Sequence, residues 1–307
     1  MVLAMQEVTY AGARCAKLAN KQLELYASLD VGPRIIGLQL AGESNNILKT
    51  YPDQLANPNP DQFELYGGHR LWAAPEIAGF TDEPDGRPLD KAHMDGGALV
   101  LEGALGVSKL RKQIRVWIDN NQVHIQHTLT NEGDEPVEVA LWALSVMEAG
   151  GVGLTPQGPY VPHGETLDPE RPLVMWPYTR MNDPRVRWGN RMIRLNQHPS
   201  GGPFKYGAWL KEGLAGYWRN NLLFLKAFPP GRVENLLDFG CSFETFTREE
   251  MLEVESLSEK VVLAPGESAS HPETWAIFTA DAAPFGEDEG RDWFDQHGLK
   301  MSPWFLD

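Results

Sequence analysis

The sequence predicts an all-β protein of mostly antiparallel strands with few short helices. Short runs in which apolar and polar residues alternate recur along most of the chain, and this period of two is typical of half-buried strands. The 30 glycines and 23 prolines are spread between these runs. Regular short strands separated by turn residues favour a sandwich or barrel of antiparallel sheet.

The strands are expected in two series. The first series comprises residues 22–29, 34–42, 97–103, 107–118, 121–131 and 136–147. The second series comprises residues 187–197, 213–221, 221–228, 243–247, 250–258 and 270–278. One helix is predicted at residues 286–299, because acidic residues occupy its first turn and Gly298 ends it.

Two long segments do not have a strand pattern. Residues 50–96 and 153–184 are rich in proline and glycine, yet they also carry several aromatic residues. Long loops in compact proteins are often functional, and the aromatic content argues against disorder. We therefore expect ordered loops that border a cleft. No linker or change in composition divides the chain, which predicts a single domain over residues 1–307.

The charge balance excludes one class of partner. The formal net charge is −15, with 42 acidic residues against 27 basic ones, whereas a nucleic-acid partner requires a basic surface. No apolar stretch reaches the 18 residues of a membrane span, and the first residues lack the pattern of a signal peptide. The expectation is a cytoplasmic protein with no nucleic-acid or membrane partner.

Motifs for metals and cofactors are also missing from the sequence. Cys15 and Cys241 lie far apart and have no metal-ligand spacing around them. The chain contains no Walker loop, no GxGxxG sequence and no Ser-His-Asp order. We therefore expect neither a metal site nor a cofactor.

The segment YGGHRLWAAPE, residues 66–76, concentrates chemically active residues. Two glycines allow a sharp turn, after which His69 and Arg70 are expected to enter the cleft. Arg70 either binds a carboxylate, a phosphate or neighbouring hydroxyls, or it pairs with a buried acid. Trp72 either stacks on a sugar ring or belongs to the core. Glu76 is either a loop cap or a functional group.

Three stretches resemble the galactose mutarotase-like (aldose 1-epimerase-like) superfamily. They are LELYASLDVGPRIIGLQLAG, GGHRLWAAPE and EMLEVESLSEKVVLAPGESASHPETWAIF, and they lie in the order expected for that superfamily. A GGHRLWxAPE signature indicates an uncharacterised branch. The resemblance implies a β-supersandwich with a carbohydrate cleft on its concave face.

The resemblance also implies catalytic roles. In mutarotases of the superfamily a glutamate is the general base at the anomeric hydroxyl, and it corresponds here to Glu255 or, two residues away on the same face, to Glu253. The general acid is a histidine. The corresponding stretch VALWALSVMEAGG, residues 139–151, contains none, and Trp142 stands near its place.

Other residues are candidates for the missing acid or for sugar binding. His69 and His163 are the candidate substitute acids, and Glu148 lies close to the missing histidine. His124 shares a strand face with polar residues, so it is either a ligand or a hydrogen-bonded strand residue. The basic cluster at residues 185–194, together with Lys205 and Arg219, faces either an anionic substrate or solvent.

These observations favour a carbohydrate-active protein with a small-molecule sugar partner. The leading hypothesis is an aldose 1-epimerase-like isomerase that uses Glu255 and His69 in acid/base chemistry at the anomeric carbon. One alternative is a non-catalytic carbohydrate-binding domain. Another is an isomerase or lyase that acts on an anionic sugar, a uronate or a phosphorylated sugar, held by Arg70.

Overall fold

The computed structural model describes residues 5–280, 291, 292, 294, 296 and 299–301. Two large antiparallel sheets dominate it, as the sequence predicts. The helix predicted at residues 286–299 lies largely outside the described residues. No helix in the described part of the chain is long and apolar enough to cross a membrane.

The first sheet carries the segments singled out by the sequence. Its path of neighbouring strands is β1 (Gln6–Tyr10), β2 (Ala13–Ala19), β3 (Leu23–Ser28), β4 (Arg34–Leu40), β5 (His69–Ala74), β10 (Val137–Glu148), β19 (Met251–Leu257), β18 (Phe243–Arg248), β15 (Phe204–Ala208) and β12 (Leu173–Met175). Strand β20 (Val261–Leu263) pairs with one end of β10.

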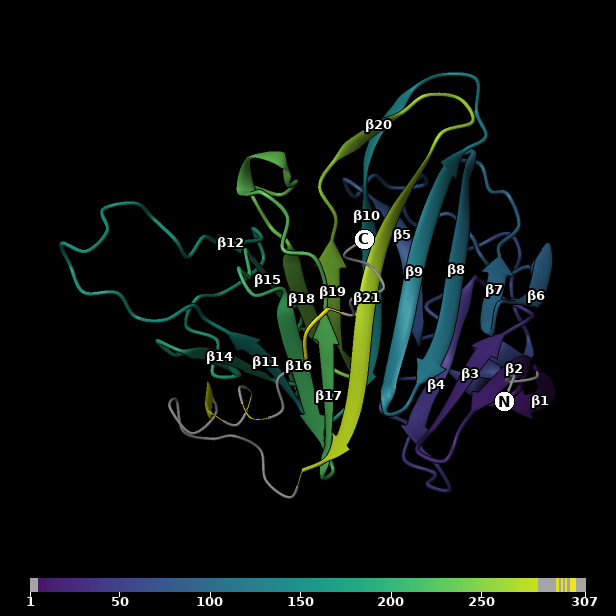
Figure 1. Ribbon diagram of the computed structural model, residues 1–307, viewed down its shortest axis with the longest axis horizontal. Coiled ribbons are helices and arrows are strands. Elements are labelled where there is room, and N and C mark those ends of the chain that lie inside the picture. Colours follow the sequence, from purple (N-terminus) through teal and green to yellow (C-terminus); the bar gives the residue numbers. More distant parts are fainter. Residues whose placement is uncertain (1–4, 281–290, 293, 295, 297–298, 302–307) are drawn as a thin grey trace.

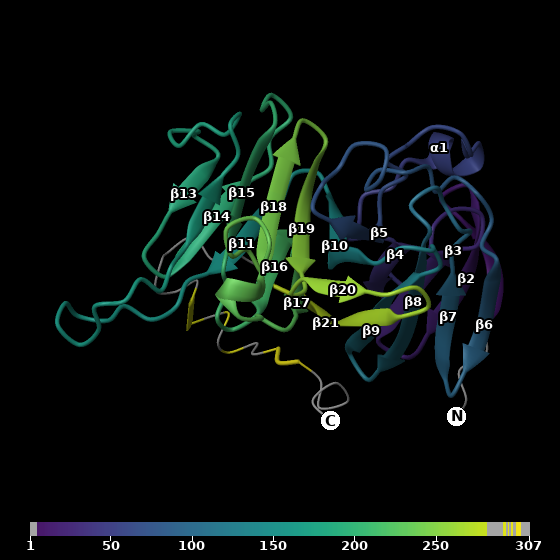
Figure 2. The same ribbon diagram turned by 90° about the horizontal axis from the view of Figure 1, so that it is seen from above.

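The second sheet packs across the first. Its order is β13 (Val186–Trp188), β14 (Met192–Asn196), β11 (Val152–Pro156), β16 (Leu214–Arg219), β17 (Leu222–Ala227), β21 (Ser268–Thr279), β9 (Gln122–Asn131), β8 (Leu110–Asp119), β7 (Ala98–Glu102) and β6 (Lys91–Asp95). Figure 1 shows β17, β21, β9 and β8 in front of the sheet that holds β19, β10 and β5. Figure 2 shows the two sheets from above.

Apolar side chains fill the space between the two sheets. The main cluster joins alternate residues of both sheets, among them Leu25, Ile114, Phe224, Leu252 and Trp275, all of which are fully buried. Burial of this kind contributes about 25 cal/mol per Å² of apolar surface removed from water. Short helical segments, α1 (Pro52–Ala56) and a 3₁₀ turn (Val233–Asn235), lie outside this core.

The two segments expected as loops contain strands. Residues 50–96 include the central strand β5 and the edge strand β6, whereas residues 153–184 include β11 and β12. The segment between β11 and β12 extends away from both sheets (Figures 1 and 2). The loop expectation was wrong for β5, because this strand is buried on both faces and therefore lacks an alternating pattern.

The turn into β5 depends on its two glycines. Gly67 and Gly68 have φ angles of +79° and +71°. A Cβ atom on Gly68 would lie 2.3 Å from the backbone oxygen of Ile35, and one on Gly67 would lie 2.2 Å from that of Lys49. Only glycine fits such a close approach of three backbone segments. This turn places Arg70 and Trp72 in the middle of the sheet.

Candidate functional site

A cavity of about 340 Å³ opens on the face of the first sheet that points away from the second. Strands β5, β10, β19, β18 and β15 form its floor, and loops on either side form its walls. Its aromatic lining consists of Phe63, Trp72, Trp142, Tyr178 and Phe246. Its charged lining consists of Arg70, Glu76, Lys205, Arg248 and Glu253. Flat apolar surfaces beside charged groups are typical of a site for a polar small molecule.

Strand register places these side chains on one face. Trp72 pairs with Trp142 across β5 and β10, and Phe246 pairs with both Glu253 and Lys205. Residues that pair directly in antiparallel strands point to the same side of a sheet. Five strands from distant parts of the sequence therefore contribute to one surface.

Glu255 lies on the same face of the sheet, opposite Leu144 of the cavity lining, but below the exposed surface. Its side chain is fully buried, and its Oε2 atom accepts a hydrogen bond of 2.8 Å from the indole nitrogen of Trp142. The Nζ atom of Lys205 is 3.5 Å from the same oxygen, while Oε1 has no partner among the described residues. Burial raises the pKa of Glu255 to about 7, although the charge of Lys205 opposes the rise.

Lys205 connects the buried carboxylates to the cavity. Its Nζ atom lies 2.6 Å from Glu244 and 4.5 Å from the ring centres of both Trp142 and Trp176. Such contacts favour a cation, with each ring contributing about 0.5–2 kcal/mol. Burial lowers the pKa of Lys205, but Glu255 and Glu244 outweigh it and hold the pKa above its usual range. Burial raises the pKa of Glu244 well above its usual value.

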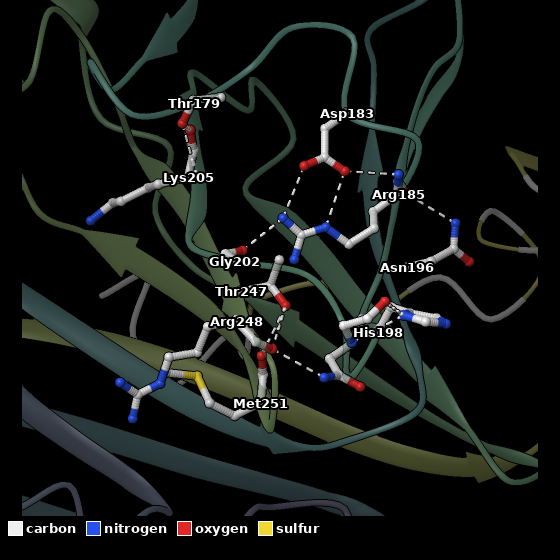
Figure 3. Close-up of polar contacts among 12 residues, drawn as sticks. Thr179, Asp183, Arg185, Asn196, His198, Gly202, Lys205, Thr247, Arg248 and Met251 are labelled. Atoms are coloured by element: carbon white, nitrogen blue, oxygen red, sulfur yellow. Dashed lines mark hydrogen bonds and ion pairs between the residues drawn. The ribbon is translucent and has the colours of Figure 1, made fainter.

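The loop that carries Trp176 and Tyr178 is tied to β15 beside Lys205. Thr179 accepts a hydrogen bond from the Lys205 backbone nitrogen at 3.0 Å and donates one to its carbonyl oxygen. Figure 3 shows the Lys205 and Arg248 side chains extending to the same side, away from the ion pair of Asp183 and Arg185. Both cations thus reach the cavity from neighbouring strands.

Arg70 and Glu253 form a second charged pair on the cavity face. Arg70 donates from NH2 to Glu253 Oε1 at 3.2 Å, and its guanidinium carbon lies 4.3 Å from the ring centre of Trp72. This contact brings residues 66–76, which were expected to enter the cleft, together with the strand at residues 250–258, which was expected to carry the catalytic glutamate. The expected alternative for Arg70, pairing with a buried acid, is also observed.

His69 points to the other side of the sheet. Its Nδ1 atom lies 2.9 Å from Ser145 Oγ, and its Nε2 atom lies 2.6 Å from His127 Nε2, between the two sheets. Burial lowers the pKa of His69 well below its usual range. The expectation that His69 enters the cleft with Arg70 was wrong, because successive residues of a strand point to opposite faces.

The remaining candidates also lie away from the cavity. His124 is buried on β9 of the second sheet, with Nδ1 at 3.3 Å from Thr274 Oγ1. His163 is exposed in the segment between β11 and β12. Glu148 ends β10 and pairs with Lys49 at 3.1 Å. No histidine occurs among the described residues that line the cavity.

One set of described residues has the ligand types of a metal site. His69, His127 and Glu273 bring their ligand atoms within 4.8 Å of one another in the sandwich interior. The two Nε2 atoms are 2.6 Å apart, whereas two ligands of a tetrahedral zinc ion at about 2.0–2.1 Å would be more than 3 Å apart. Lys226 already neutralises Glu273 at 3.0 Å. This arrangement fits a hydrogen-bonded network better than a metal site.

Several residues of the cavity were missed or left open by the sequence. Lys205 had an ambiguous role, and Tyr178 was considered only as an aromatic residue of the loop at residues 153–184 that was expected to border a cleft. Glu244, Phe246 and Arg248 were not considered as site residues. A signal existed, because FETFTR and EMLEVESL form a hairpin in which Glu244 pairs with Glu255. The period of two then places Glu244, Phe246 and Arg248 on the same face as Glu255.

Comparisons with known proteins identify the fold. No protein-family model and no curated protein sequence matches the chain. Among solved structures, a protein from Synechocystis sp. PCC 6803 aligns with a TM-score of 0.58 and 11% identity, over 90% of this chain and 100% of that one. A galactose mutarotase-like protein from Lactobacillus casei aligns with a TM-score of 0.56 and 11% identity, over 86% and 100%.

A second galactose mutarotase-like protein, from Clostridium acetobutylicum, aligns with a TM-score of 0.52 and 12% identity, over 90% of this chain and 99% of that one. Identities this low show the fold alone. The chain therefore has the galactose mutarotase-like fold, and the fold expected from the resemblance is confirmed.

Proposed function

We propose that this chain binds a carbohydrate in the cavity above β5, β10, β19 and β18. The observation that supports the proposal most directly is the lining, which combines five aromatic side chains with five charged ones. A sugar ring presents C–H groups on its faces and hydroxyl groups at its edge. Aromatic rings pack against the faces, and charged side chains donate to or accept from the hydroxyls.

Trp72 and Trp142 are the principal candidates for the apolar contact. Their rings meet edge to face, with centres 5.5 Å apart, and both border the cavity. Arg70 and Glu253 are the principal polar candidates, because they supply a donor and an acceptor at the same place. The cavity volume of about 340 Å³ is within the range of small-molecule sites.

A direct binding measurement tests the proposal. A panel of hexoses, pentoses, uronates and sugar phosphates is screened by thermal shift, and each hit is titrated by calorimetry. We expect at least one sugar to bind, and Trp142→Ala to weaken that binding. A panel without any hit, or hits that Trp142→Ala leaves unchanged, would contradict the proposal.

The second candidate function is exchange at the anomeric carbon of that sugar. The observation that favours it is the pKa of about 7 at Glu255, next to Lys205 and Trp142. A base whose pKa lies near the working pH is suited to take and return a proton. Glu253 borders the cavity itself, so it is the carboxylate placed to contact the sugar, while Glu255 lies one layer deeper.

In this candidate reaction the carboxylate base, Glu253 or Glu255, removes the proton of the anomeric hydroxyl, and the bond between C1 and the ring oxygen breaks. The ring oxygen leaves as an alkoxide and C1 becomes an aldehyde carbon. After rotation about the bond between C1 and C2, the alkoxide attacks the other face of C1, and the carbonyl oxygen takes its proton back from the base, which gives the second anomer. Lys205 replaces the histidine of the superfamily as the positive group that stabilises the charge on the ring oxygen. The pKa of Lys205 is held above its usual range, so its contribution is electrostatic.

Polarimetry on a freshly dissolved sugar distinguishes the two functions. An enzyme accelerates the approach to anomeric equilibrium, and Glu255→Gln or Glu253→Gln should then reduce the rate by about 10²–10⁴-fold, the usual contribution of a general base. A wild-type protein that binds the sugar but leaves exchange at the buffer rate is a binding protein only.

A further inference from the structure

Arg70 has hydrogen-bonding capacity that the protein does not use. Its side chain is 3% exposed, yet Nε and NH1 have no partner among the described residues, and only NH2 is bonded, to Glu253. A buried donor without a partner costs about 1–3 kcal/mol, and more when it is charged. Such a residue at the wall of a cavity indicates that a ligand supplies the missing acceptors.

We propose that the ligand of this cavity is an anionic sugar, whose carboxylate or phosphate group is bound by Arg70 with Arg248 as the second cation. The inference rests on the proposed sugar binding and adds the charge of the ligand. It assigns specificity to two arginines of the first sheet, whereas the contacts of the sugar ring itself are made by the tryptophans.

The chemistry of the donors supports an anion over a neutral sugar. A guanidinium group is donor-only, with five N–H groups and no acceptor, and ionised carboxylates and phosphates are acceptor-only. A hydroxyl both donates and accepts, so its own hydrogen needs another acceptor beside the arginine. Hydrogen bonds between two charged groups are about twice as strong as those between neutral groups. An anionic oxygen is therefore the better match for Nε and NH1.

The charges of the cavity lining also favour an anionic ligand. Three of the lining residues are cations and two are carboxylates, although the whole chain carries a formal net charge of −15. Glu253 is already bonded to Arg70, and Glu76 is exposed to water, which weakens its repulsion of an anion. Arg248 is 41% exposed and also has an unpartnered Nε atom. The lining thus carries one more cation than carboxylate, although Lys205 is paired with Glu244 and Glu255 and Arg248 with Glu250.

The test compares each neutral sugar with its charged forms. Glucose and galactose are titrated beside their uronates and their 6-phosphates, at 20 mM and at 500 mM salt. At low salt we expect a charged form to bind about 10- to 100-fold more tightly than its neutral parent, from one or two charge-assisted hydrogen bonds. The advantage should shrink at high salt. A uronate and a phosphate that differ reveal which anion the site prefers.

Variants then locate the anion. Arg70→Gln should weaken the charged sugar more than its neutral parent, so that most of the affinity advantage of the charged form is lost. Arg115→Gln is the matched control, because Arg115 lies on β8 of the second sheet and pairs with Asp95. Arg248→Gln leaves the pair of Arg70 and Glu253 intact, so it tests the site even if Arg70→Gln fails to fold.

The possible outcomes separate the two proposals. Equal affinities of neutral and charged sugars would overturn the inference but leave sugar binding in place. Equal weakening of both forms by Arg70→Gln would overturn it too, because Arg70 would then contact hydroxyls. If Arg70→Gln and Arg248→Gln both keep the full affinity advantage of the charged sugar over the neutral one, the anion binds elsewhere and the inference is overturned. A protein that binds none of the sugars would refute the proposed function, and this inference with it.

Discussion

Glu255→Gln should make the protein more stable at pH 8 than the wild type. The carboxylate is fully buried, and Oε1 lacks a partner among the described residues. Glutamine keeps the shape and an acceptor for the indole N–H of Trp142, but it carries no charge. A charge held in an unfavourable place is a mark of function rather than of folding, so this measurement tests the site assignment without any knowledge of the ligand.

The magnitude follows from the pKa of Glu255, which burial raises from 4.5 to about 7. Each pKa unit corresponds to about 1.36 kcal/mol between the two protonation states. Because the folded pKa is the higher one, its contribution to stability is complete below pH 4.5 and is lost as the pH rises through 7. The wild type should therefore lose about 3 kcal/mol more than Glu255→Gln over this range, because Glu244, whose pKa is also raised, titrates in both proteins.

Urea denaturation at pH 5 and pH 8 measures the difference, with circular dichroism as the signal. Glu253→Gln is the matched control, because it makes the same change on the same face of β19, two residues away. That variant weakens the pair with Arg70 and should destabilise the protein by about 1–3 kcal/mol at pH 8. If Glu255→Gln is less stable than the wild type at pH 8, Glu255 belongs to a favourable ion pair with Lys205 and the reasoning fails.

Three other predictions follow from single contacts. Lys226→Met should destabilise the protein by about 3–5 kcal/mol in urea denaturation, because it leaves the fully buried Glu273 without its cation; an unchanged midpoint would contradict this. Trp72→Ala should weaken binding of any sugar found in the panel by about 0.5–1.5 kcal/mol in calorimetry, the worth of an aromatic contact, and equal affinity would remove Trp72 from the site. Gly68→Ala should lower the melting temperature far more than Gly97→Ala, since both have positive φ but only the Cβ at position 68 meets backbone within 4 Å.

Local patterns in the sequence were sufficient for the fold class. Alternation and turn residues predict most of the strands, and the strands from β7 to β10 follow the expected series closely. The failure at β5 has a physical cause. This strand has neighbours on both edges and is buried on both faces, so none of its residues is a polar surface position. An alternating pattern identifies strands that are buried on one face only. It does not identify a strand that is buried on both faces.

Residues of the site could be predicted from the sequence only by working out which face of its strand each side chain occupies. The resemblance implied that residues 66–76 and the strand of Glu253 and Glu255 border one cleft, and the contact between Arg70 and Glu253 confirms that the two segments meet. The prediction that His69 and Arg70 both enter the cleft was wrong because successive side chains of a strand point to opposite faces of the sheet. Lys205 lies about fifty residues before Glu255, and only the pairing of β15 with β18 brings the two together. Contacts of this kind arise from topology, which short sequence patterns do not contain.

The two faces of the first sheet differ in how completely their polar groups are bonded. Between the sheets, Lys226 donates to Glu273, which also accepts from Trp275, and His69 and His127 bond to each other. This inward cluster contributes no atom to the buried polar groups that lack partners in the described part of the chain.

On the cavity face, by contrast, Arg70, Glu244, Arg248 and Glu255 each retain a buried polar atom without a partner. Buried polar groups in folded proteins are nearly always satisfied, so a cluster of exceptions requires a cause. Other described residues also carry such atoms, among them Arg34, Asp85 and Arg185, but four residues with such atoms meet at or beside the cavity, where a ligand could supply their partners. The asymmetry therefore supports the proposed site on the cavity face. It favours a structural role for the inward histidines, although the resemblance to the superfamily implies a histidine as the general acid.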